Sequence, residues 1–152
     1  MRALIPLTLL LTACANPHEP QLAINPFPQG DLSDESLVID FQSLATDSRF
    51  LSYQLIRVQR GDIENGQVYD IPFTAPAERD LILVSACGSG CTSPVLALYD
   101  FEGKSVSSPT YGGNRAYIGL NVGTSPKQFR LDLSLTSCPR QTCSAYWALY
   151  AK

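Results

Sequence analysis

The chain has 152 residues, carries a formal net charge of -3 and contains no cluster of basic residues. This balance argues against a partner held through its own negative charge, whether nucleic acid or an anionic lipid surface. Apolar residues make up 45% of the chain, and its 7 Tyr and 6 Phe favour strands over helices. We therefore expect one domain built mainly from β-strands.

The N-terminus has the features of an export signal that ends at a cysteine. Arg2 supplies a positive charge, and residues 3–13 form an apolar run that is too short for a stable transmembrane helix. The segment Leu11-Thr12-Ala13-Cys14 resembles the bacterial lipobox. That resemblance implies a signal peptide over 1–13, cleavage before Cys14, and a lipoprotein with diacylglyceryl on the Cys14 thiol and an acyl chain such as palmitate on its amine. The alternative is an ordinary signal peptide with a chance cysteine.

Residues 14–35 contain four prolines and few apolar anchors, which predicts a lipidated N-terminus followed by an extended tether. The domain itself is then expected over 36–152. In lipoproteins of enteric bacteria an Asp after the lipidated cysteine favours retention in the inner membrane, and here Ala15 follows Cys14. The resemblance therefore implies a bacterial cell envelope protein, anchored in the outer membrane and facing the periplasm.

Alternating or continuous apolar runs predict eight or nine strands, and their spacing favours a single antiparallel β-sandwich of jelly-roll type. Two continuous runs, 81–84 and 95–99, are expected to be central and buried on both faces, whereas Pro72 places its strand at an edge. A hairpin connection is expected over 100–104, with Gly103 at positive φ. The expected strands are 37–41 and 50–58, where a short helix is the alternative, and 68–73, 81–84, 95–99, 116–122, 129–136 and 145–150.

Four cysteines remain once Cys14 is assigned to lipid, an even number in an exported chain, which indicates disulfides. Three pairings are possible. We favour the local one, Cys87–Cys91 with Cys138–Cys143, because a short turn separates the members of each pair. A four-thiolate zinc site is the alternative, but the spacing is wider than CxxC and an oxidising compartment disfavours free thiolates.

From Gly61 to Tyr150 the order of features resembles the bacterial pre-peptidase C-terminal (PPC) domain. The resemblance rests on the acidic start at 60–66, the strand around Tyr69, the apolar strand 81–84 and the stretch 95–103 (VLALYDFEG), followed by a polar strand near 127–135 and an aromatic last strand. It implies a small jelly-roll-like sandwich that serves as an accessory or binding module. It transfers no catalytic residue to this chain.

Candidate sites for chemistry are few. The only histidine, His18, lies in the expected tether, which leaves neither a catalytic triad nor nitrogen ligands for a transition metal on the domain, and no cofactor is expected beyond the lipid on Cys14. Asp62 and Glu64 could bind calcium, although solvated turn carboxylates are the commoner case. The best candidate for a partner-binding loop is 111–115, with Tyr111, Asn114 and Arg115, since Tyr and Arg are favoured in protein interfaces.

These observations favour a non-enzymatic envelope module that binds a protein partner. A carbohydrate- or peptidoglycan-binding module is the second hypothesis, and it requires an exposed platform of aromatic side chains. A periplasmic inhibitor or immunity protein that plugs an enzyme's cleft is the third.

Overall fold

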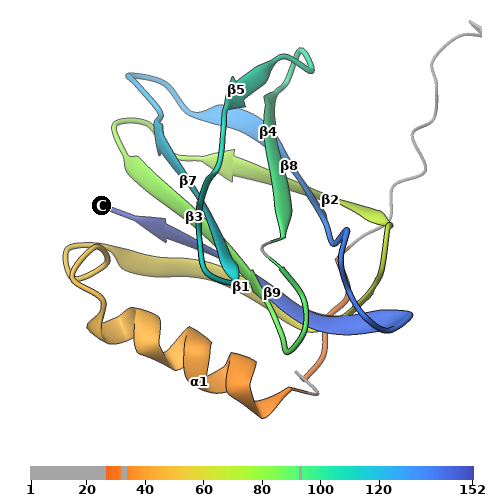
Figure 1. Ribbon diagram of the computed structural model, residues 1–152. Helices are drawn as coiled ribbons and strands as arrows, with labels where there is room; N and C mark the ends of the chain where they lie inside the picture. The colour runs from red at the N-terminus through yellow and green to blue at the C-terminus, as the bar shows by residue number, and fades with distance from the viewer. Residues whose placement is uncertain (1–26, 32–33, 93) are drawn as a thin grey trace, which may run out of the picture.

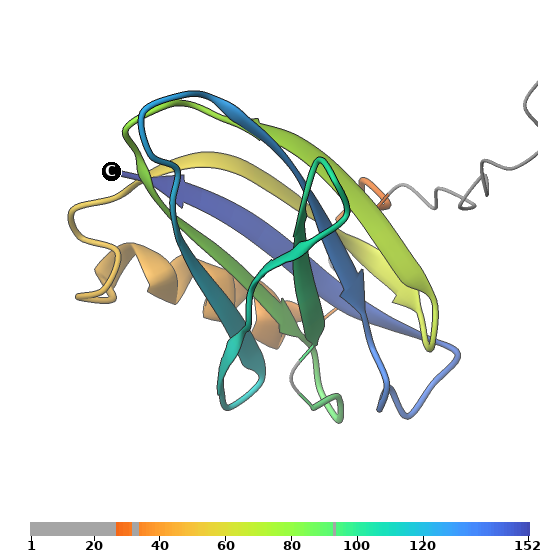
Figure 2. The same ribbon diagram turned by 90° about the horizontal axis from the view of Figure 1, so that it is seen from above.

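The computed structural model describes residues 27–31, 34–92 and 94–152. In these residues nine antiparallel strands form two sheets that pack face to face, and one short helix lies against the outer side of the larger sheet (Figures 1 and 2). The expected all-β sandwich is therefore confirmed. The expected signal peptide, Cys14, His18 and the first part of the expected tether lie outside the described residues.

The larger sheet has the order β1-β9-β3-β7-β6, and the smaller one has the order β2-β8-β4-β5. The edge position of β2, which holds Pro72, and the internal positions of β3 and β4 agree with the sequence analysis. The strands are β1 Gln54–Glu64, β2 Val68–Ala75, β3 Asp80–Cys87, β4 Val95–Asp100, β5 Ser105–Ser107, β6 Thr110–Gly112, β7 Arg115–Asn121, β8 Lys127–Ser134 and β9 Thr142–Ala151.

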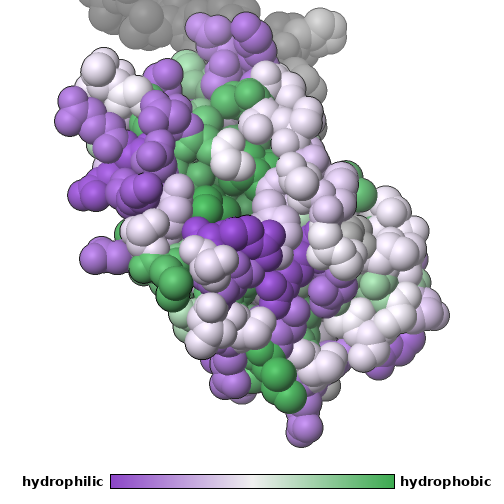
Figure 3. Space-filling model, turned by 60° about the vertical axis from the view of Figure 1, so that its left-hand side comes forward, coloured by the Kyte–Doolittle hydropathy of each residue, from purple (hydrophilic) through white to green (hydrophobic). Residues whose placement is uncertain are grey.

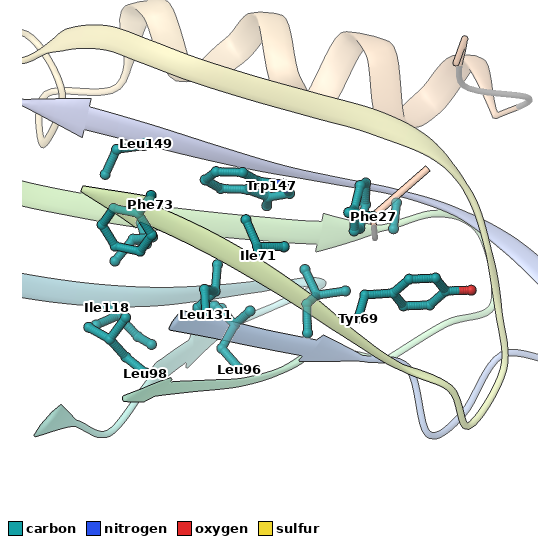
Figure 4. Close-up of a cluster of buried hydrophobic side chains, with 14 of the residues drawn as sticks. Phe27, Tyr69, Ile71, Phe73, Leu96, Leu98, Ile118, Leu131, Trp147 and Leu149 are labelled. Carbon is teal, nitrogen blue, oxygen red and sulfur yellow. The ribbon is translucent and has the colours of Figure 1, made fainter. Parts of the chain in front are cut away.

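The main core fills the space between the two sheets (Figure 4). Trp147 of β9 lies at its centre with no exposed surface, and its indole nitrogen donates to Oε1 of Gln59 at 2.9 Å. That bond satisfies the one polar group of a large buried side chain, as burial requires.

A second core lies on the outer face of the larger sheet, under α1 (Glu35–Ser43) and the short 3-10 helix η1 (Leu44–Thr46). The favoured strand over 37–41 was wrong, and the structure has a helix there, which was the alternative. Asp34 caps the helix by accepting from the backbone of Ser36 at 3.0 Å, and the buried Leu37 and Leu44 face the sheet at helical spacing. The sequence predicted that β4 would be buried on both faces, and this was wrong. The strand that is buried on both faces is β9, because α1 covers the outer face of the larger sheet.

The folded unit begins earlier than the boundary expected at residue 36. Phe27 is only 4% exposed and packs edge-on against Tyr69, with ring centroids 5.8 Å apart (Figure 4). Gly30 donates its backbone N–H to the carbonyl of Arg60 at 2.8 Å, which satisfies part of the edge of β1. Two flanking prolines suggested a tether here, but the single aromatic side chain between them belongs to the core.

Candidate functional site

Both predicted cysteine pairs lie at disulfide distance, with Cα atoms 5.9 Å apart for Cys87–Cys91 and 6.0 Å for Cys138–Cys143. The two closed loops meet at one end of the sandwich. The backbone N–H of Thr92 donates to the hydroxyl of Ser137 at 3.0 Å, and Gly90 lies directly beside Pro139. We call this the clamped end. The pairing favoured from the sequence is confirmed.

The Cys87–Cys91 loop also holds the start of α1. The Asp34 carboxylate, which caps the helix through Ser36, accepts a second bond from the backbone N–H of Ser89 at 2.7 Å. The hydrogen bonds from Ser36 and then from Ser89 lower the pKa of Asp34 well below its usual range. Gly88 leaves room for this contact, because a Cβ there would lie 2.5 Å from Asp34 Oδ2.

We therefore expect Gly88→Ala to destabilise the protein by about 1–2 kcal/mol, the usual range for a lost N-cap. Urea unfolding followed by tryptophan fluorescence measures this. Gly30→Ala is the matched control, because nothing lies within 4 Å of a Cβ at that position and its φ is not in the left-handed range. Equal unfolding midpoints for the two variants would show that the Asp34 contact contributes nothing.

The predicted recognition loop has a different arrangement from the one expected. The Arg115 guanidinium lies under α1, where its Nη2 is 2.6 Å from Asp40 Oδ1 and donates to the Ser43 hydroxyl at 2.7 Å. Burial alone would lower the pKa of Arg115, but the hydrogen bond to Asp40 raises it above its ordinary value. Asn114 donates to the carbonyl of Cys87 at 3.1 Å. Arg115 and Asn114 therefore form contacts within the fold. Of the three residues predicted for this loop site, only Tyr111 is widely exposed, at 51%.

The calcium candidates Asp62 and Glu64 lie in strand β1 rather than in the expected loop, both on its exposed side. Asp62 accepts a hydrogen bond from the Ser144 hydroxyl at 2.6 Å. In the described residues no three His, Cys, Asp or Glu side chains gather where they could hold a metal ion. No helix among them is long and apolar enough to cross a membrane.

Among the residues that the structure describes, the most exposed large apolar side chain is Phe101, at 83%, in the turn between β4 and β5. Asp100 fixes this turn, since its Oδ1 accepts the backbone N–H groups of Glu102 at 3.0 Å and Lys104 at 2.8 Å. Gly103 has a φ of +78° and donates its N–H to the carbonyl of Asp100. The sequence predicted this hairpin and its glycine, but not that it presents an aromatic ring to solvent.

Two hollows flank the Phe101 turn. The first, of about 600 Å³, we call the Leu120 hollow; Val106, Leu120 and Phe129 line it together with the turn. The second, of about 720 Å³, we call the Arg57 hollow; Arg57, Phe73 and Arg130 line it on the other side of the turn. Phe101 and the two hollows form the Phe101 surface. It lies at the opposite end of β4 from the clamped end, because β4 starts soon after the Cys87–Cys91 loop and ends at Asp100.

The outer face of the smaller sheet carries a charged cluster beside the Arg57 hollow. Asp70 and Asp132 are cross-strand partners of β2 and β8, and Arg130 Nε lies 2.8 Å from Asp132 and 3.8 Å from Asp70. The same guanidinium stacks over the ring of Tyr99 at 4.6 Å. Burial, together with the neighbouring Asp70 carboxyl, raises the pKa of Asp132 to about 6, although Arg130 opposes the shift.

This pKa predicts that stability falls as the pH rises from about 4 to about 6. Asp132 binds its proton more tightly in the folded protein than in the unfolded chain, so ionisation costs folding free energy, and above pH 6 the full cost is present. We expect Asp132→Asn to stabilise the protein by about 1–2 kcal/mol at pH 7.5 and to flatten this part of the pH profile. Urea midpoints between pH 3.5 and 8 measure it, with Glu64→Gln as an exposed control. Parallel pH profiles for the wild type and Asp132→Asn would contradict the assignment.

The described Tyr and Trp side chains do not form an open platform. Trp147 and Tyr146 are fully buried, Tyr99 is covered by Arg130, and Arg49 lies over the ring of Tyr117 at 4.5 Å. On the side shown in Figure 3, apolar surface gathers in separate patches with a hydrophilic belt between them. That side of the molecule therefore has no continuous apolar face.

Comparison with known proteins finds no matching family model and no matching curated protein. Among solved structures, the chain is similar to the pre-peptidase C-terminal domain of a collagenase from Bacillus anthracis, with a TM-score of 0.50 and 11% sequence identity. The match covers 62% of this chain and 89% of that one. The fold is that of a PPC-like β-sandwich. The resemblance inferred from the sequence is thus confirmed for the fold, and at this identity it extends no further.

Proposed function

We propose that the protein is a lipid-anchored envelope lipoprotein whose PPC-like sandwich is a non-catalytic module that binds another protein through the Phe101 surface. The observation that carries this proposal is the exposed Phe101 ring on a turn fixed by hydrogen bonds to Asp100. A rigid apolar side chain beside hollows is suited to protein recognition, because little conformational freedom is lost when it binds.

The anchor fits this arrangement. Between Cys14 and Phe27 the chain spans at most about 45 Å when fully extended, enough to separate the sandwich from a lipid surface. Phe27 packs against Tyr69, one residue into β2 and therefore near the clamped end. Attachment at that end leaves the Phe101 surface directed away from the membrane.

Affinity purification of the intact lipoprotein from detergent-solubilised envelopes of its own host, followed by mass spectrometry, tests the proposal. We expect at least one protein to co-purify at a reproducible ratio, and the ratio to survive digestion of peptidoglycan. Recovery of no specific protein, in either a hetero-complex or a self-complex, would count against it.

The peptidoglycan-binding alternative predicts a different result in the same extract. The protein would then sediment with purified cell wall and be released by muramidase. Since only Tyr111 and Phe101 are widely exposed among the described aromatic side chains, we expect sedimentation no greater than that of an unrelated lipoprotein.

A further inference from the structure

The Phe101 surface has a protruding ring and a hollow side by side. Phe101 forms one wall of the Leu120 hollow, whose floor is apolar and comes from Val106, Leu120 and Phe129. With a volume of about 600 Å³, the hollow is in the range of sites that enclose small ligands, so it has room for an aromatic ring. A surface that carries both a knob and a hole is complementary to itself.

The charges at the hollow are self-complementary as well. Glu102 and Lys127 both line it, and neither forms an ion pair with any residue that the structure describes. They come from different elements, the β4–β5 turn and the first residue of β8. If the surface faced a copy of itself across a two-fold axis, Glu102 of each copy would approach Lys127 of the other.

We propose that the occupant of the Leu120 hollow is Phe101 of a second copy of this chain, in a two-fold symmetric dimer; this rests on the proposed function, whose protein partner it identifies. In such an isologous contact each copy contributes the same knob and the same hole, and both rings lie close to the axis. Asp100 also lines the hollow, so the lining carries two carboxylates and one lysine, and a strongly acidic occupant is disfavoured.

The symmetry gives a direct test in the intact lipidated protein. Side chains near a two-fold axis lie close to their own copies. We expect the photo-crosslinker p-benzoyl-phenylalanine, incorporated at Phe101 in the native host so that an aromatic ring is kept there, to yield a covalent dimer of twice the chain mass after irradiation. The control carries the same photo-crosslinker at Val68, whose site is 50% exposed and starts β2 near the clamped end, and it should remain monomeric.

Charge exchange separates a specific contact from random collision. With the photo-crosslinker at Phe101, Glu102→Lys and Lys127→Glu should each lower the dimer yield by roughly fivefold or more, because each places like charges opposite one another. The combined Glu102→Lys/Lys127→Glu exchange should restore most of the yield. Failure of this restoration would overturn the proposal.

Two further outcomes have distinct meanings. A dimer yield with the photo-crosslinker at Phe101 no higher than with it at Val68 overturns the second-copy occupant. A covalent adduct from Phe101 to a different protein also overturns it, while it supports protein binding by the Phe101 surface. The envelope purification decides independently whether any protein is bound at all.

Discussion

Replacement of Cys14 by serine is expected to abolish acylation. A hydroxyl cannot form the thioether that lipobox proteins carry at this position, and a chain without two or more acyl groups is not held firmly at a membrane. Labelling of growing cells with an alkyne analogue of palmitate should therefore mark the wild type and not Cys14→Ser. In carbonate-washed membranes the amount of the variant should fall by about tenfold or more.

The matched control is Asn16→Ala, a substitution in the expected tether that leaves the lipobox intact. It should be labelled and pelleted as the wild type is. Equal labelling of Cys14→Ser and the wild type would show that Cys14 is not the site of acylation, and it would favour the alternative of an ordinary signal peptide.

Truncation of Trp147 is expected to have the largest effect on stability. The side chain is fully buried between the sheets, so Trp147→Ala leaves a large cavity and removes the partner of Gln59. Such substitutions cost about 3–5 kcal/mol. Thermal unfolding followed by far-ultraviolet circular dichroism should show a melting temperature many degrees lower, or no cooperative transition.

Phe101→Ala provides the comparison, because it also removes an aromatic ring but from a site that is 83% exposed. We expect it to change stability by less than about 0.5 kcal/mol, as for other surface substitutions. A large loss of stability in Phe101→Ala would mean that the ring supports the fold, and it would weaken the case that Phe101 is kept for binding.

Much of the fold could be predicted because its signals are local. Alternation along residues 129–136 and the continuous run 81–84 identify strands, and Pro72 identifies an edge, since each depends on the residues themselves. The short loops of the two cysteine pairs made the pairing predictable in the same way. The helix over 35–43 was only the alternative to a strand because its local signal is weak: Leu37 is its one fully buried side chain, and that burial depends on the outer face of the larger sheet.

The candidate site was less predictable because its parts are distant in the sequence. Tyr and Arg in the 111–115 loop indicated an interface, but Arg115 pairs with Asp40, which is 75 residues away in a segment that the sequence analysis favoured as a strand. Phe101 looked like one of many aromatic side chains in a strand-rich chain. The Phe101 ring is exposed because it lies in the turn that Asp100 closes. The Leu120 hollow beside it is lined by residues of β7 and β8 as well as of the turn.

The most direct test of protein binding through the Phe101 surface compares the proteins that co-purify with wild-type and with Phe101→Ala lipoprotein from solubilised envelopes. Each strain also expresses a second wild-type copy that carries a different tag. Quantitative mass spectrometry gives the amount of each recovered protein per molecule of bait, and Val68→Ala serves as the control. We expect the recovery of the tagged copy, and of any other specifically bound protein, to fall by about tenfold with Phe101→Ala and to be unchanged with Val68→Ala. An unchanged ratio with Phe101→Ala, or no specific protein with any bait, would rule out binding through the Phe101 surface.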